Sequence, residues 1–111
     1  MNNSTFNKIT EERLQACIDV MCHKSDEYST ESDRLHNFKV AGSIQGCSAI
    51  KALGGMMCKH TVSVYDLIND FESGKEISLA LWDEKIGDSI NYLLLLNAMV
   101  VEHEVDKQKK M

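Results

Sequence analysis

Acidic and amide side chains follow one another at helical spacing in the segment WDEKIGDSINYLLLL, residues 82–96. Glu84, Asp88 and Asn91 are three or four residues apart, so on an α-helix they share one face beside an apolar stripe. A carboxylate at the edge of a core needs a cation, hydrogen-bond donors or water, because burial without a partner is strongly unfavourable. One way to meet this need is a hard divalent cation such as Mg²⁺, which binds carboxylates and phosphate oxygens together.

Lysine and histidine side chains on a second predicted helix are other possible partners for these carboxylates. In a functional interpretation, Lys59 faces the phosphates of a ligand whose Mg²⁺ is held by Glu84 and Asp88. In a structural interpretation, Lys59 pairs with Glu84 or Asp88 and fixes the register of two helices. Asn91 then makes an interhelical hydrogen bond, and His60 lies on the neighbouring apolar side of its helix. The spacing alone is compatible with both.

A second group of reactive or stacking side chains lies in residues 23–38, HKSDEYSTESDRLHNF. Acids near the end of the first predicted helix oppose its dipole, a cost that a cation could offset. An aromatic ring could stack on a base, and a histidine could titrate near neutral pH. A solvated acidic loop is the alternative interpretation. The candidate ligand-binding residues here are Tyr28, His36, Asn37 and Phe38, and the candidate metal ligand is Glu27.

Length and charge restrict the classes of function. The chain has 111 residues, enough for one domain, and its net charge of −5 gives no reason to expect nucleic-acid binding. The polar N-terminus lacks the features of a signal peptide. The longest apolar run, residues 92–101, is about half of a bilayer span. We therefore expect a cytoplasmic protein without a membrane partner.

The elements that must position these residues are helices, because proline is absent and apolar residues recur with helical period. Thr10, Ser48 and Ser78 are predicted N-caps. The pair Gly54-Gly55 inside a predicted helix suggests a close helix crossing or an approaching ligand. The predicted helices are 10–28, 33–45, 48–72 and 78–104, preceded by an N-terminal arm, 1–9, and followed by a charged tail, 105–111.

Four helices with short connections predict an antiparallel four-helix bundle. The last predicted helix is apolar on all sides from residue 92 to 101, and a small bundle has little interior to cover so broad a face. We therefore expect a homodimer or a higher homo-oligomer.

Four motifs in this order, DEYS, RLHNF, GMMCKH and WDEKIGDSINYLLLL, resemble a family of small phage and prophage proteins of unknown function. That family is akin to the nucleotide-modification-associated and MazG-like all-α nucleotide pyrophosphohydrolases. The resemblance covers residues 14–102. It implies an oligomeric helical bundle with a carboxylate-lined site for a nucleotide and Mg²⁺, in the host cytoplasm if the chain is phage-encoded. The matching positions are Glu27-Tyr28-Ser29, then Met56, Met57 and Lys59, then Asp88, Asn91 and Tyr92.

The chain departs from the MazG-like pattern in its acids. Lys85 stands three residues before Asp88, where an acid is typical, and the central helix has no E-x-x-E. One hypothesis is therefore a protein that binds a nucleotide or a nucleotide-derived messenger with little or no turnover. A second is a non-enzymatic anti-defence inhibitor that acts on a host defence protein. A third is a Mg²⁺-dependent MazG-like pyrophosphohydrolase, for which Asp26, Glu27 or Asp33 would have to join Glu84 and Asp88 at the metal.

Overall fold

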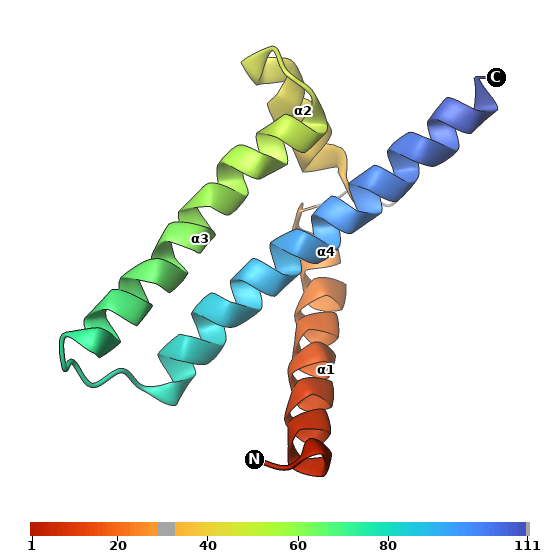
Figure 1. Cartoon of the computed structure of the whole chain (residues 1–111). Helices are drawn as coiled ribbons and strands as arrows, with labels where there is room; N and C mark the ends of the chain where they lie inside the picture. Colours follow the sequence, from red (N-terminus) through yellow and green to blue (C-terminus); the bar gives the residue numbers. More distant parts are fainter. Residues whose placement is uncertain (29–32, 111) are drawn as a thin grey trace.

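The computed structural model describes residues 1–28 and 33–110, without the side chains of residues 23–28, and confirms the predicted all-α fold for these parts. None of the helices in the described parts combines the length and apolar character that a bilayer crossing requires. The described chain forms four helices, α1 (Asn3–Tyr28), α2 (His36–Gln45), α3 (Ala49–Glu72) and α4 (Leu79–Lys109) (Figure 1).

The first helix begins earlier than the sequence predicted. The side-chain oxygen of Asn2 accepts a hydrogen bond from the backbone N–H of Thr5 at 2.8 Å, and α1 starts at Asn3. Asparagine is a favoured N-cap because this bond satisfies one of the unpaired N–H groups of a first helical turn. The prediction of a start at Thr10 after an arm over residues 1–9 is therefore wrong.

The starts of α3 and α4 agree with their predicted serine caps. The Ser48 hydroxyl accepts a hydrogen bond from the N–H of Lys51, and the Ser78 hydroxyl accepts one from the N–H of Leu81, both at 3.1 Å. The end of α4 differs from the prediction, because the helix continues to Lys109 through the expected tail. Lysines in its last turn complement the negative end of the helix dipole.

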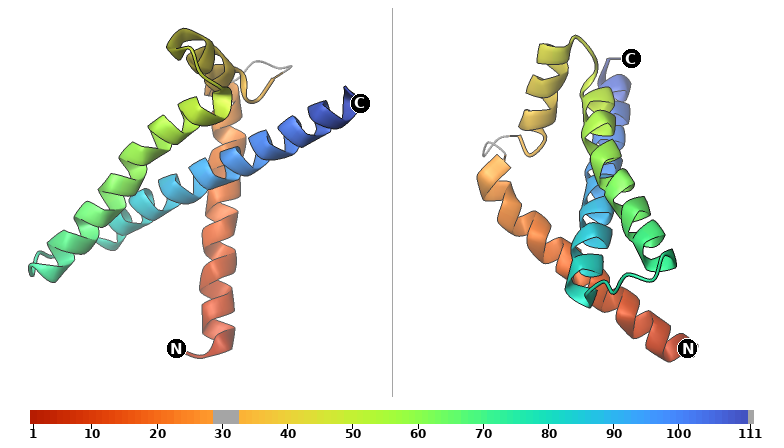
Figure 2. Two further views of the ribbon diagram at one scale, coloured as in Figure 1. Left: turned by 45° about the horizontal axis from the view of Figure 1, so that its top comes forward. Right: turned by 90° about the vertical axis from the view of Figure 1, so that its left-hand side faces the viewer.

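The helices are spread apart rather than closely gathered. Helices α3 and α4 form an antiparallel hairpin, α2 packs against α3, and α1 crosses α4 obliquely (Figure 2). The radius of gyration is 16.8 Å, whereas a compact domain of this length has about 13 Å. Much helical surface is therefore left without a neighbour.

The core lies where α2 and α3 meet the second half of α4. Its buried members are Leu35, Phe38, Leu53, Leu95 and Met99, and Leu53 is fully buried. This cluster holds the start of α2 over α4, which places the polar residues beside it.

Glycines define the turn between α2 and α3. A Cβ on Gly42 would lie 2.8 Å from the backbone oxygen of Cys47, so only glycine fits there. Gly46 ends α2 with φ +69°, in agreement with the predicted stop. The expected close helix crossing at Gly54-Gly55 is not found, because a Cβ on either residue would have no neighbour within 4 Å in the described structure, and the approach of a ligand there stays a prediction.

Large apolar side chains remain exposed along the two helices that cross. Such side chains usually lie in a core or at an interface, and monomeric proteins rarely expose large apolar patches. The exposed residues include Phe6, Ile9, Leu14, Ile18 and Val20 on α1, and Leu79, Ile86, Leu93, Leu94, Val100, Val101 and Val105 on α4.

Candidate functional site

A cavity of about 420 Å³ opens beside the core. Side chains of α2, α3 and α4 line it, together with Met21 of α1 and Arg34, which precedes α2. Residues far apart in sequence therefore meet there. The lining residues are Met21, Arg34, Asn37, Phe38, Met56, His60, Asp88, Asn91, Tyr92 and Leu95.

Aromatic rings form one wall of this cavity. The rings of His60 and Tyr92 are tilted by 32° with centroids 4.6 Å apart. Phe38 meets Tyr92 edge to face, with centroids 6.4 Å apart. Such rings give a flat ligand a surface to stack on.

A histidine and a carboxylate face each other across α3 and α4. Nδ1 of His60 lies 3.6 Å from Oδ2 of Asp88, and both side chains are largely buried. The distance suits an ion pair when the imidazole is protonated, and it is too long for a strong hydrogen bond. Lys59, which the structural interpretation paired with Asp88 or Glu84, is exposed, and His60 is the α3 residue beside Asp88.

Asn91 is the buried polar residue of the site. It is 8% exposed, and its side-chain oxygen has no hydrogen-bond partner among the described residues. The interhelical hydrogen bond expected for Asn91 is therefore not made by this oxygen within the described structure. A buried acceptor without a donor costs about 1–3 kcal/mol. Because this oxygen is closed off from solvent, a ligand in the cavity could remove the cost only if the amide side chain turned toward it.

Hydrogen bonds hold the segment that carries Arg34. The Arg34 guanidinium donates to the backbone oxygen of Met21 at 3.4 Å, which links the segment before α2 to α1. Next to it, Lys39 donates to Asp33 at 2.8 Å and contacts Glu102 of α4 at 2.9 Å. The hydrogen bond with Asp33, then that with Glu102, raises the pKa of Lys39 to about 12. The same hydrogen bond from Lys39, and to a smaller extent one from the backbone N–H of Leu35, lowers the pKa of Asp33 below 3.8.

A second hollow of about 300 Å³ lies between α1 and α4 and shares Asp88 and Asn91 with the first cavity. An ion pair between Arg13 and Asp83 spans its edge. Glu84 lines this hollow and is exposed. Glu84 and Asp88, the two predicted metal ligands of α4, thus border the same hollow.

Metal binding by Glu84 and Asp88 stays a prediction. Among the side chains that the structure describes, no three His, Cys, Asp or Glu residues come close enough to hold a metal ion. The side chains of Glu27 and Tyr28, predicted to bind metal and to stack on a base, lie outside the described residues.

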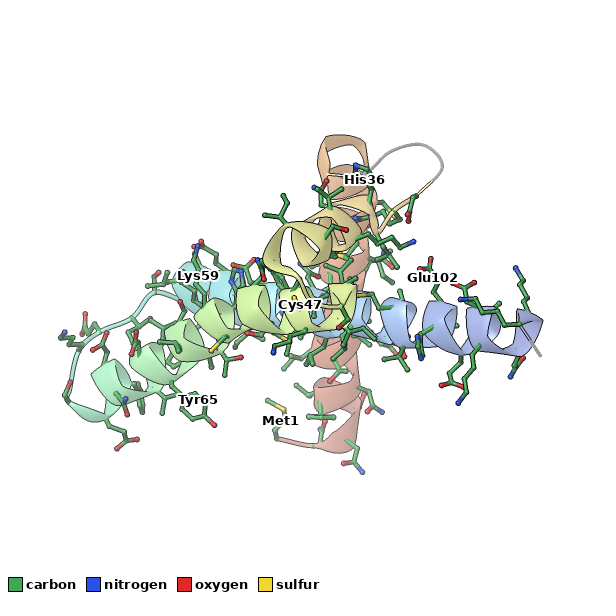
Figure 3. All side chains as sticks on the ribbon, turned by 90° about the horizontal axis from the view of Figure 1, so that it is seen from above. Met1, His36, Cys47, Lys59, Tyr65 and Glu102 are labelled. Carbon is green, nitrogen blue, oxygen red and sulfur yellow. The ribbon has the colours of Figure 1, made fainter. Side chains whose placement is uncertain are left out.

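The structure brings together only part of the predicted set. Asn37, Phe38, Asp88 and Asn91 line one cavity, whereas His36 and Lys59 are exposed and lie apart on the molecule (Figure 3). Neither of these two is among the residues that line the cavity.

Three charged or aromatic side chains of the cavity were not among the ligand-binding residues that the sequence predicted. They are Arg34, His60 and Tyr92. A polar histidine four residues after Met56, within an apolar stripe, was a signal for His60. Tyr92 follows Asn91 directly and appears in the motif that carries the resemblance.

Comparisons with protein-family models, curated proteins and solved structures found no match to this chain. The resemblance to phage and MazG-like proteins therefore stays a prediction, and the function has to be argued from the site itself.

Proposed function

We propose that the protein binds a nucleotide, or a small molecule derived from one, in the cavity between α2, α3 and α4, with little or no turnover. One observation carries the proposal: aromatic rings, a guanidinium and two amide side chains converge on one partly enclosed space of about 420 Å³. Binding sites for small ligands are typically 300–1,000 Å³ and combine apolar walls with a few polar groups.

The lining residues fit the two parts of a nucleotide. The rings of Phe38, His60 and Tyr92 suit a base, because aromatic rings stack on its faces. Arg34 suits a phosphate, which a guanidinium binds through paired hydrogen bonds. Among the described lining residues Arg34 is the one lysine or arginine, so the cavity favours a ligand with few phosphates inside it. Lys59 is a candidate for charges that extend beyond the cavity.

The test is a thermal-shift screen with nucleosides, nucleoside mono- and triphosphates and cyclic dinucleotides, with and without Mg²⁺. A ligand that binds only the folded state raises the melting temperature. Hits are measured by isothermal titration calorimetry, and the ligand is recovered and analysed chromatographically. We expect stoichiometric binding and unchanged ligand.

Variants locate the site and separate the alternatives. Arg34→Gln should weaken phosphate-bearing ligands more than the matching nucleosides, whereas Lys8→Gln on exposed α1 should change neither. Mg²⁺-dependent product that disappears in Asp88→Asn would instead establish the pyrophosphohydrolase. Absence of binding by every compound would overturn the proposal and direct attention to a protein partner, such as a host defence protein.

We also infer that a second copy of the chain completes an antiparallel helical bundle. The exposed apolar side chains of α1 and α4 and the large radius of gyration support this association. Two copies could cover both surfaces through one symmetric interface. Light scattering coupled to size-exclusion chromatography should give twice the mass of the chain, and a monomer at all concentrations would refute the inference.

A further inference from the structure

We propose that the cavity selects bases that carry an amino group, and that this selection is made by the carboxylate of Asp88, which lies beside the buried amide of Asn91. The inference rests on the proposed nucleotide binding and adds the class of base. The preferred ligands are guanine, cytosine and adenine nucleosides or nucleotides, and those of uracil, thymine and hypoxanthine are rejected.

Two hydrogen-bond acceptors lie next to each other on α4. Asp88 and Asn91 are three residues apart, so their side chains share one helix face, and both line the cavity. A carboxylate offers only acceptors when it is ionised, and the His60 imidazole lies beside it, with Nδ1 3.6 Å from Oδ2 of Asp88. His60 and Asp88 therefore lie side by side at the cavity wall.

The amide of Asn91 belongs to the same wall of the cavity as Asp88. More than nine-tenths of this residue is buried, and its oxygen has no donor among the described residues. Buried polar atoms in native proteins are nearly always hydrogen-bonded, and those that are not call for an explanation such as a ligand. The missing partner must be a donor, because the unpaired atom is an oxygen.

The edges of the bases differ in this respect. Guanine presents an N–H and an adjacent amino group, and cytosine and adenine each present one amino group. A carboxylate can accept hydrogen bonds from these groups. Uracil and thymine place carbonyl oxygens on both sides of their N–H, and hypoxanthine replaces the amino group of adenine with a carbonyl oxygen. A carbonyl oxygen turned toward Asp88 would be repelled by the carboxylate, and the single ring N–H on that edge could satisfy only one acceptor. Sites built around buried hydrogen bonds discriminate strongly against ligands that lack them.

Stacking does not give this selectivity, because every base has aromatic faces. The rings of Phe38, His60 and Tyr92 can therefore hold any base, while α4 reads its edge. The two contributions can be separated by experiment.

The experiment compares matched ligand pairs by isothermal titration calorimetry: guanosine with inosine, and cytidine with uridine. Each pair differs in the amino group that the proposal makes decisive. We expect the amino-bearing member of each pair to bind at least about tenfold more tightly. Equal affinities within both pairs, or tighter binding of inosine and uridine, would overturn the inference and leave nucleotide binding intact. Absence of binding by all four nucleosides and their monophosphates would overturn both proposals.

Two variants test the assigned atoms. Asp88→Asn keeps the shape of the side chain but adds an N–H donor, so the preference for cytidine over uridine should fall toward one or reverse. Ser89→Ala is the matched control, because Ser89 is also on α4 and its hydroxyl is also buried without a described partner, yet it does not line the cavity. The control should keep the wild-type ratio. Circular dichroism verifies that both variants fold, and an unchanged ratio in folded Asp88→Asn would show that Asp88 does not read the base.

Discussion

Replacing Asn91 with leucine should make the ligand-free protein more stable and abolish ligand binding. Leucine has nearly the shape of asparagine but no polar atoms. The substitution removes an amide oxygen that is buried without a described partner, in a residue that borders the core residue Leu95 along α4. A residue kept for stability would show the opposite result.

The expected size follows from two contributions. Removing an unsatisfied buried acceptor gains about 1–3 kcal/mol. Leucine is also a better helix former than asparagine, by roughly half a kcal/mol. Imperfect packing of the new methyl groups offsets part of this gain, since overpacking can cost about 1–3 kcal/mol. We expect a net increase of about 1 kcal/mol in the free energy of unfolding, which corresponds to roughly 4 °C in Tm.

The assay is urea unfolding followed by circular dichroism, at one protein concentration because association shifts apparent stability. Ser89→Ala serves as the comparison: it also removes a buried oxygen without a described partner and should also raise stability, but ligand affinity should not change. If Asn91→Leu lowers the free energy of unfolding by about 1 kcal/mol or more, the amide makes a stabilising hydrogen bond and the reasoning is refuted. The structural interpretation of Asn91 would then be correct.

Three further predictions test the fold. Gly42→Ala should destabilise the protein by more than about 1 kcal/mol, because its Cβ would meet backbone atoms. Gly54→Ala should instead stabilise it by up to about 1 kcal/mol, because its Cβ would meet no neighbour and alanine favours the helix. Urea titrations of the two variants measure both effects. Lys39→Met should cost about 0.2–1 kcal/mol at neutral pH, since the ion pair is half exposed. The pKa of Asp33 is lowered below 3.8, so the stabilisation by this pair is present above that pH and is lost as the pH falls through the lower value. Because the pKa of Lys39 is raised from 10.5 to about 12, the stabilisation is also lost as the pH rises through that range. Urea titrations of the wild type and Lys39→Met at several pH values measure the difference in their free energies of unfolding. A difference that stayed constant across pH would contradict the prediction. Val101→Glu should convert a dimer to monomers by placing a charge on the exposed apolar face of α4, and light scattering that finds an unchanged mass would exclude this face from the interface.

The sequence predicted the helices well because periodicity and capping are local properties. Ser48 and Ser78 cap the predicted helices, and Gly46 ends α2. Thr10 was assigned as a cap although Asn2 performs that role for a longer helix. A polar N-terminal segment and a helix exposed on most sides have similar compositions, so hydrophobic periodicity could not separate them.

The site was only partly predictable, because it depends on how the helices cross. Glu84 and Asn91 lie on one face of α4 by helical spacing, yet Glu84 is exposed and Asn91 is buried. Their difference comes from the other helices, which cover α4 unevenly along its length. In the same way, the register of α3 on α4 places His60, and not the adjacent Lys59, beside Asp88.

Two features of α4 conflict with what stability alone would favour, and they concern different surfaces. One is a buried amide whose oxygen has no described partner, and the other is a set of exposed leucine and valine side chains. A conflict of this kind within an otherwise consistent fold is expected where function restricts the sequence. The buried amide points to a small ligand with hydrogen-bond donors, and the exposed apolar side chains point to a protein surface. Asn91→Leu and Val101→Glu test these interpretations independently, because one changes the cavity wall and the other changes the exposed face of the same helix.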